Sequence, residues 1–216
     1  GVILYTSGTS GRPKGVMLTH GNIAANVRQI KEWVDIDVDF TFLGVLPQFH
    51  SFGMTVLTLL PLSVGAKVVY TARFVPGKLL RLIREHRPTI FVAIPSMFNA
   101  LLHAKDVSAD DFSSIRFMVS GGEPLPQAVF EAFRERFGIT INEGYGLTET
   151  SPVSNWCRPW EWRQGSVGRA LPGIEQRIVD PRGRLLPAHA DGEVQMRGPN
   201  IMKGYYKLPE ETAKAF

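Results

Sequence analysis

The amino-acid sequence predicts an α/β fold with a mostly parallel sheet flanked by helices, followed by a small antiparallel β subdomain. Through residue 142, short apolar stretches alternate with stretches whose apolar residues recur at helical spacing, which is typical of βαβ units. Several strand candidates are apolar at every position, as expected for strands buried on both faces. After about residue 165, short strands separated by tight turns follow. We therefore expect an α/β subdomain over residues 1–162 and a β-rich subdomain over residues 163–216.

Local signals place the elements of the α/β subdomain in order. The apolar run 2–4 predicts a buried strand, and Thr19 can cap the helix that follows. Apolar residues on one face of that helix are Ile23, Val27, Ile30 and Val34. Further strands are expected at residues 40–46, 67–71, 89–94, 116–120 and 140–142. Further helices are expected at residues 52–62, 76–86, 95–104 and 126–137, with Gly65 terminating the first and Pro95 starting the third.

The β-rich subdomain is expected to contain strands at 174–179 and 192–197, with a turn at Pro181-Arg182-Gly183. In parallel sheets, ligands bind beyond the carboxyl ends of the strands. The polar loop after the first strand, Gly121-Gly122-Glu123 and Glu143-Gly144-Tyr145 are all expected to follow their strands. These three segments are therefore the candidates for a ligand site.

Composition is typical of a globular protein, with 44% hydrophobic and 20% charged residues. The net charge of +4 allows attraction to small polyanions but does not indicate nucleic-acid binding. The only cysteine is Cys157 and there is no Asn-x-Ser/Thr acceptor, so we expect a cytoplasmic protein. The longest apolar stretch, 52–65, is too short to span a bilayer and contains Pro61.

The first motif is Tyr5-Thr6-Ser7-Gly8-Thr9-Ser10-Gly11-Arg12-Pro13-Lys14-Gly15. Glycine lets backbone N–H groups turn inward toward an anion, and Lys14 adds a mobile charge suited to phosphate. The same residue types also dominate ordinary surface turns, but Lys14 and the preceding strand favour a polyphosphate cradle. Neither a Walker A loop nor a G-x-G-x-x-G pattern is present, because Pro13 precedes Lys14 and the glycines fall at 8, 11 and 15.

The second motif is Gly144-Tyr145-Gly146-Leu147-Thr148-Glu149-Thr150. The glycines allow a flat ligand to approach the backbone, and the Tyr145 ring offers a stacking face. Thr148 can donate to a phosphate, and Glu149 is an oxygen ligand suited to Mg²⁺. Taken alone, the segment could equally be a polar turn with one structural tyrosine.

Together these motifs resemble those of the acyl-adenylate-forming enzymes, which include acyl-CoA synthetases, luciferases and peptide-synthetase adenylation domains. The resemblance covers almost the whole chain and is greatest to long-chain fatty acyl-CoA and acyl-carrier-protein synthetases. Phe49-His50-Ser51-Phe52-Gly53 and Gly198-Pro199-Asn200-Ile201-Met202 carry that closer resemblance. It implies a fragment of the large N-terminal domain. ATP, Mg²⁺ and coenzyme A, or a phosphopantetheine carrier protein, would be the cofactors.

The resemblance implies a reaction in two steps in the full-length parent. The carboxylate of a fatty acid would attack the α-phosphate of ATP to give acyl-AMP and pyrophosphate, and a thiol would then displace AMP. Charge stabilisation dominates such chemistry. Catalytic roles fall on Lys14, His50, Thr148 and Glu149, and Mg²⁺ would be bound by Thr6 and Glu149. The residues implied to contact the nucleotide are Thr6, Ser7, Gly8, Thr9, Ser10, Gly11, Lys14, Gly122, Glu123, Pro124, Asn142, Glu143, Gly144, Tyr145, Gly146, Leu147 and Thr148.

The acid substrate would lie near His50, Gly121 and Gly122, with the imidazole steering the carboxylate. Amino-acid-activating relatives place an aspartate near this point, whereas this chain has no acid between residues 40 and 62. The glycines at 121 and 122 and the apolar stretch 52–62 are compatible with a tunnel for a fatty acyl chain. The same residue types are also expected in an ordinary packed core. Gly204-Tyr205-Tyr206 resembles a later family motif that is mainly structural.

Several alternatives remain open at this stage. Trp156, Trp160 and Trp162 near Arg158 and Arg163 suggest a nucleic-acid surface less well than a loop that packs on the core or on a missing domain. A nucleotide-binding module without ligase activity, a ligase for aryl or short-chain acids, and a phosphohydrolase are the rival functions.

The ends of the chain also lead to expectations. The chain starts on a strand and stops within the helix-like run 209–214, so we expect an excised fragment without the C-terminal lid domain. Such a fragment should bind nucleotide weakly and turn over little substrate. Contact with a membrane surface and the oligomeric state are left open.

Overall fold

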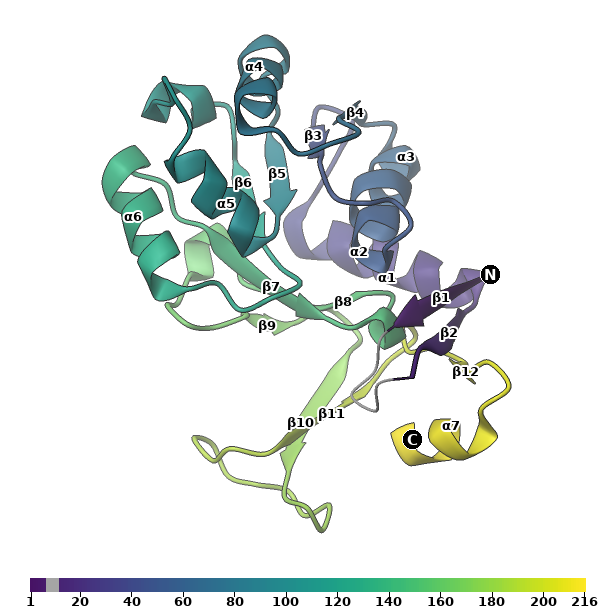
Figure 1. Ribbon diagram of the computed structural model, residues 1–216. Helices are drawn as coiled ribbons and strands as arrows, with labels where there is room; N and C mark the ends of the chain where they lie inside the picture. Colours follow the sequence, from purple (N-terminus) through teal and green to yellow (C-terminus); the bar gives the residue numbers. More distant parts are fainter. Residues whose placement is uncertain (7–11) are drawn as a thin grey trace.

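The computed structural model describes residues 1–6 and 12–216 and confirms the α/β class. Its main sheet has seven strands in the order β4-β3-β5-β6-β7-β8-β9 (Figure 1). Strands β3 to β7 are parallel, and β8 and β9 add antiparallel partners at one edge. The bounds are β3 Thr41–Gly44, β4 Lys67–Tyr70, β5 Ile90–Ala93, β6 Phe117–Ser120, β7 Asn142–Gly146, β8 Val153–Trp156 and β9 Arg169–Ala170.

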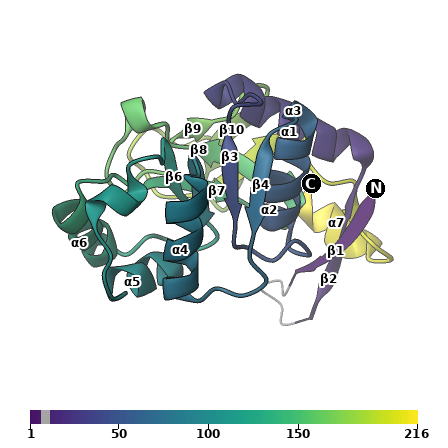
Figure 2. The same ribbon diagram turned by 90° about the horizontal axis from the view of Figure 1, so that it is seen from above.

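Helices flank this sheet as predicted. Helices α4 (Pro76–His86), α5 (Pro95–Leu102) and α6 (Gln127–Phe137) pack together on one side, and α1 (His20–Val34) lies on the other (Figure 2). The phenylalanines Phe42, Phe91, Phe98, Phe112 and Phe133 are fully buried in this part of the fold. Short 3₁₀ turns occur at η2 Ala109–Phe112, η3 Thr148–Thr150 and η4 Pro159–Glu161.

The predicted cap of α1 is confirmed in atomic detail. The Asn22 N–H donates to Thr19 Oγ1 at 3.0 Å, and the Thr19 N–H donates to Asn22 Oδ1 at 2.9 Å. This reciprocal pair satisfies backbone donors that have no partner within the helix. Every residue predicted on the apolar face is packed inward, although Ile23 is only partly buried.

Residues 2–4 form a strand as predicted, but this strand is only partly buried and does not belong to the parallel sheet. Strand β1 (Val2–Thr6) pairs antiparallel with β2 (Lys14–Leu18), and β12 (Gly204–Tyr205) pairs with the other edge of β2. Ile3 is 42% exposed, because only one face of the hairpin packs on a small separate core that contains Val16, Leu18 and Met202. The phosphate motif therefore connects two strands of a hairpin.

The predicted helix over residues 52–62 forms, but it is irregular. It runs as α2 (Ser51–Met54), a π-helical segment η1 (Thr55–Leu59) and α3 (Leu60–Val64), and Gly65 ends it at φ 71° as predicted. Pro61 lacks the N–H that would reach the Leu57 carbonyl in an α-helix. The Tyr70 hydroxyl donates to that carbonyl at 2.8 Å and supplies the missing bond.

The expectation that Glu143, Gly144 and Tyr145 follow a strand was also wrong, because they lie within β7. The start of β7 pairs in parallel with β6, and its second half pairs antiparallel with β8, where Tyr145 lies opposite Asn155. The strand thus extends beyond the end of β6, and a register irregularity separates Tyr145 from Gly146. Gly144 and Gly146 weaken the strand pattern in the sequence, because glycine has a low propensity for strands. The neighbouring strands stabilise this one instead.

The expected antiparallel strands are confirmed as β10 (Glu175–Val179) and β11 (Glu193–Arg197), which form a ribbon that projects from the main body (Figure 1). A reciprocal amide pair joins the ribbon to β8, because Asn155 Nδ2 donates to Gln176 Oε1 at 3.0 Å and Gln176 Nε2 donates back at 2.6 Å. Helix α7 (Pro209–Ala215) follows β12. In the described part of the chain, no helix is both long enough and apolar enough to cross a membrane.

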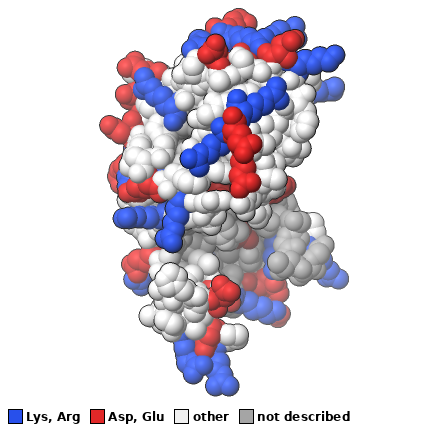
Figure 3. All heavy atoms as spheres, turned by 90° about the vertical axis from the view of Figure 1, so that its left-hand side faces the viewer, with Lys and Arg blue, Asp and Glu red and all other residues white. Residues whose placement is uncertain are grey.

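The face seen in Figure 3 carries basic and acidic side chains side by side, rather than one continuous basic surface among its described residues. Trp156 is buried against Phe117, and Trp162 stacks on Phe130 at 5.0 Å between ring centroids. These two tryptophans therefore pack on the core, whereas Trp160 is 64% exposed.

Asp111 is expected to stabilise the fold in a pH-dependent way. It is buried and accepts from Arg84 Nε at 2.6 Å, and the guanidinium, with the Ser108 N–H, lowers the pKa of its carboxyl. Asp111→Asn should therefore cost about 1–2 kcal/mol at neutral pH, since Arg84 is half exposed and part of the charge is screened. Because the pKa of Asp111 is lower in the folded state than in the unfolded state, its carboxylate stabilises the fold at pH values above the unfolded-state pKa. The cost of the substitution should therefore shrink as pH falls below about 4. Urea unfolding at pH 7 and pH 3 measures this, with exposed Asp110→Asn as the control; an equal cost at both pH values would contradict it.

Candidate functional site

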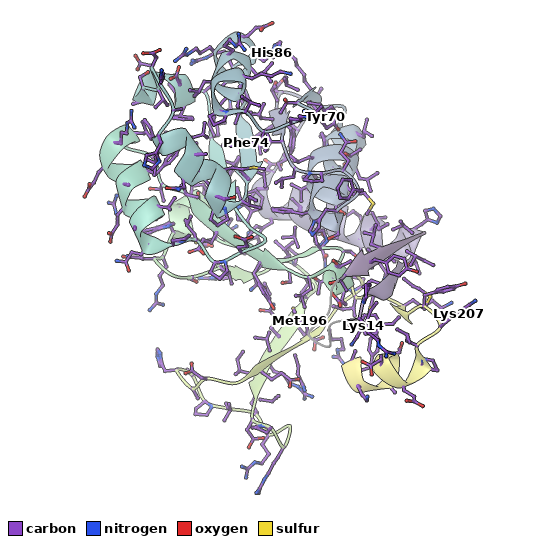
Figure 4. The ribbon with its side chains drawn as sticks, viewed as in Figure 1. Lys14, Tyr70, Phe74, His86, Met196 and Lys207 are labelled. Atoms are coloured by element: carbon purple, nitrogen blue, oxygen red, sulfur yellow. The ribbon has the colours of Figure 1, made fainter. Side chains whose placement is uncertain are left out.

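The two predicted motifs meet at the edge of the molecule where β2, η3, β12 and α7 come together. Thr6 lies directly opposite Lys14 across the β1–β2 hairpin. Lys14 reaches toward α7 (Figure 4), and its Nζ lies 2.6 Å from Glu211 Oε2 and 5.0 Å from the centre of the Tyr205 ring. The Tyr205 hydroxyl donates to Glu149 Oε1 at 2.8 Å. The structure therefore brings Thr6, Lys14 and Glu149 into one neighbourhood.

Charges alternate along this row of side chains. Lys14, with a smaller contribution from Lys214, lowers the pKa of Glu211 to about 2, so Glu211 is an anion at neutral pH. Burial, together with the Glu149 carboxylate, raises the pKa of Tyr205, so its hydroxyl stays protonated and can donate. The Lys14 side chain is only 15% exposed. A partly buried cation thus lies between an aromatic face and a carboxylate.

The backbone around Glu149 is held firmly. The Met202 N–H donates to the Glu149 carbonyl at 2.8 Å, and Asn200 Nδ2 donates to the Thr150 carbonyl at 2.8 Å. Asn200 is fully buried, so these bonds are shielded from water. The segment after β11 therefore positions the turn that carries Glu149. Thr148 is half-buried at the start of this turn, and Leu147 is 42% exposed.

His50 lies at the start of α2, where its Nδ1 accepts from the Phe52 N–H at 3.2 Å. When the imidazole is neutral, this bond assigns the proton to Nε2, which is left to donate elsewhere. In the same helix, Thr55 donates through Oγ1 to the Ser151 carbonyl at 2.9 Å. The helix that carries His50 is thus tied to the turn that carries Glu149.

Gly121 lies where a side chain would not fit. A Cβ there would be 2.9 Å from the Phe52 ring and 3.5 Å from the Gly144 carbonyl oxygen. Gly122, at φ 86°, adopts a backbone conformation that favours glycine. The loop after β6 is therefore close to Phe52 and to β7, and Gly122, Glu123 and Pro124 are exposed on it.

The other residues predicted to contact the nucleotide differ in how deeply they are buried. Tyr145, Gly144 and Gly146 are half-buried on β7, and Glu143 accepts from the Leu125 N–H at 3.3 Å. Asn142, by contrast, is only 2% exposed and its Nδ2 finds no partner in the described part of the chain, so its side chain lies inside the sheet. Ser7, Gly8, Thr9, Ser10 and Gly11 lie outside the described residues.

Sequence reasoning missed the contribution of β12 and α7. It assigned a mainly structural role to the motif that holds Tyr205, and it gave none to Glu211. No local signal could have found the Lys14–Glu211 pair, because 197 positions separate its members. No group of three His, Cys, Asp or Glu side chains that could hold a metal ion occurs among the described residues.

Comparison with known proteins identifies the family of this chain. A family model described as "AMP-binding enzyme" matches residues 2–206. A long-chain-fatty-acid–CoA ligase of Bacillus subtilis (strain 168) is 38% identical over 98% of this chain and 39% of its own length. 4-Coumarate–CoA ligase 1 of Oryza sativa subsp. japonica is 34% identical over 96% of this chain and 39% of its own length.

The fold is shared with solved structures as well. O-succinylbenzoate coenzyme A synthetase from Bacillus subtilis, solved with ATP and a magnesium ion, matches with a TM-score of 0.88 and 31% identity. That match covers 99% of this chain and 44% of the other. This chain therefore spans about two fifths of the length of these relatives. The chain belongs to the family of AMP-binding enzymes.

Proposed function

We propose that the protein containing this chain is an ATP-dependent acid–thiol ligase. A carboxylate oxygen attacks the α-phosphorus of ATP, the bond to the bridging oxygen breaks, and pyrophosphate leaves to give acyl-AMP. A thiolate then attacks the acyl carbon, and AMP leaves as the thioester forms. The thiol belongs to coenzyme A or to the phosphopantetheine of a carrier protein. The observation that carries this proposal is the meeting of Lys14 and Glu149 at Tyr205, one over its ring and the other at its hydroxyl.

Lys14 and Glu149 have complementary tasks in this proposal. Lys14 neutralises charge on the β- and γ-phosphates, for which it must exchange its contact with Glu211. Glu149, with Thr6, holds Mg²⁺, and Mg²⁺ when bound offsets the negative charge that develops on pyrophosphate. One bond from Tyr205 leaves the carboxylate able to accept a cation, because a carboxylate has about four acceptor sites. These residues therefore fit a magnesium ion bound mainly through phosphates and water.

The remaining contacts with the nucleotide are assigned to β7, to the turn after it and to the loop after β6. Thr148 contacts the α-phosphate, and the Tyr145 ring packs against adenine. The exposed loop Gly122-Glu123-Pro124 forms the other side of the adenine slot, and the Glu143–Leu125 bond holds that loop to β7. We assign Asn142 a supporting role beneath the slot, since its side chain is buried.

The acid substrate is placed beside His50 and Gly121. In its neutral form, His50 can donate from Nε2 to the substrate carboxylate and orient it toward the α-phosphate. Phe52, which lies against Gly121, offers an apolar wall for the rest of the acid. We infer a fatty acid because this segment carries no charged partner for a substrate ammonium, and because one similar relative is a long-chain fatty-acid ligase. An aryl acid is the main alternative, since another relative is a 4-coumarate ligase.

A panel of acids with the complete natural protein tests this proposal. Acids from acetate to palmitate, together with aryl acids, are incubated with Mg·ATP, coenzyme A and the protein. We expect AMP and thioester to form in equal amounts and fastest with a fatty acid. Release of inorganic phosphate without added acid would indicate a phosphohydrolase, and nucleotide binding without any product would indicate a binding module. The 216-residue polypeptide alone, at about two fifths of the relatives' length, should bind nucleotide weakly and form little product.

A further inference from the structure

Tyr205 touches both side chains on which the proposed function depends. Its hydroxyl donates to Glu149 Oε1 at 2.8 Å, and its ring lies 5.0 Å from the Lys14 ammonium. A hydrogen bond to a carboxylate is about twice as strong as a neutral one, and an ammonium over an aromatic face is attracted by the ring. The described residues show no ion pair between Lys14 and Glu149 themselves.

The backbone holds Tyr205 in place from two sides. Tyr205 pairs with Val16 of β2, and its N–H donates to Thr212 Oγ1 of α7 at 2.9 Å. Gly204 beside it has φ 139°, and a Cβ there would lie 2.7 Å from the Thr212 side chain. The strand and the helix therefore fix the backbone that carries the Tyr205 ring.

We propose that Tyr205 is a positioning residue that keeps Lys14 and Glu149 apart and oriented for a magnesium–polyphosphate ligand. Lys14 pairs with Glu211 rather than with Glu149, and the Tyr205 hydroxyl occupies one oxygen of Glu149, so the carboxylate keeps its other acceptor sites for a metal. The Tyr205 hydroxyl donates to one oxygen of the Glu149 carboxylate without adding charge. The Tyr205 ring attracts the Lys14 ammonium without forming an ion pair with it. This inference rests on the proposed function, because it takes Lys14 and Glu149 as the polyphosphate and metal ligands.

The neighbouring residue provides a matched control. Tyr206 is 42% exposed, and its ring lies 5.3 Å from the Lys207 ammonium rather than near Lys14. Its N–H donates to the Gly15 carbonyl at 2.7 Å, so its backbone is held much as that of Tyr205 is. Removing its hydroxyl changes the same chemical group without touching Glu149.

The test compares Mg·ATP with AMP, because AMP lacks the phosphates that Tyr205 is proposed to serve. Calorimetric titration of the complete natural protein gives both affinities. Tyr205→Phe should weaken Mg·ATP binding about tenfold and change AMP binding less than twofold. Tyr205→Leu, which also removes the ring, should weaken Mg·ATP binding further, and Tyr206→Phe should bind both as the unaltered protein does.

Three outcomes would overturn the proposal. Equal losses for Mg·ATP and AMP would show a merely structural role, and an unchanged Mg·ATP affinity in Tyr205→Phe would show no role. In both cases the proposed function would be unaffected, because it depends on thioester formation by the unaltered protein. If the unaltered protein binds neither nucleotide, the proposed function fails and this inference fails with it. A thermal unfolding scan of each variant identifies any that does not fold, and Tyr205→Phe then decides, since it keeps the ring.

Discussion

Replacing Gly146 with alanine is expected to destabilise the fold by about 3 kcal/mol or more and to abolish nucleotide binding. A Cβ at this position would overlap the carbonyl oxygen of Pro152 and lie 2.7 Å from its carbonyl carbon. Both are backbone atoms, so no side-chain rotation can relieve the clash. Strand β8 would have to separate from β7 next to Tyr145, where the register is already irregular.

Gly77→Ala is the matched control for this prediction. Gly77 lies in the first turn of α4, and a Cβ there would meet nothing within 4 Å. Alanine is a better helix former than glycine, so this variant should be more stable by up to about 1 kcal/mol. Urea unfolding of both variants measures the difference. A loss below about 1 kcal/mol for Gly146→Ala would show that β7 and β8 are not packed as closely as described.

Replacing Glu149 with glutamine is expected to lower acid-dependent pyrophosphate exchange into ATP by at least about 100-fold. Glutamine keeps the shape and an oxygen that can accept from Tyr205, but it removes the negative charge that a magnesium ion requires. The loss should therefore appear with little change in stability. Because the backbone of residue 149 is held by Met202, the new side chain should occupy the same place.

Glu175→Gln is the control for the charge change. Glu175 is exposed on the β10–β11 ribbon and pairs only with Arg197 there, at 2.8 Å. Its replacement should leave exchange within about twofold, since exposed ion pairs contribute little. Exchange by Glu149→Gln at more than a tenth of the normal rate would argue against a metal-binding role for Glu149.

Much of the main sheet could be predicted because its signals are local. Helix α4 occupies the predicted residues 76–86, and the Thr19 cap and the Gly65 terminator follow from side chains within a few positions of each helix end. The buried strand β5 is apolar throughout, and β6 is apolar up to its last residue, Ser120, as two-sided burial favours. In these elements, propensity, pattern and tertiary packing agree.

The hairpin and the second half of β7 could not be predicted, because distant partners determine them. Strand β2 is identified by its pairing with β1 and with β12, and the residues of β12 lie 187 or more positions further along the chain than their partners in β2. The glycines of β7 are tolerated only because β6 and β8 supply its hydrogen bonds. A pattern read along the sequence contains no information about such partners.

The candidate site divides in the same way. The two motifs contain Lys14, Tyr145 and Glu149, and their residue types alone suggest phosphate, stacking and metal binding. The contacts that orient these side chains come from Tyr205, Asn200 and Glu211, which are remote in sequence. Side-chain orientation at the site is therefore a property of the fold, and it could not be read from the motifs.

The central claim is that one nucleotide contacts the β1–β2 hairpin, β7 and η3 together. Hydrogen–deuterium exchange of the complete natural protein, with and without saturating Mg·ATP, tests it most directly. We predict slower exchange in the peptides that cover these three elements and no change in those of α4 and α6. Protection confined to α4 and α6, or to only one of the three elements, would contradict the account.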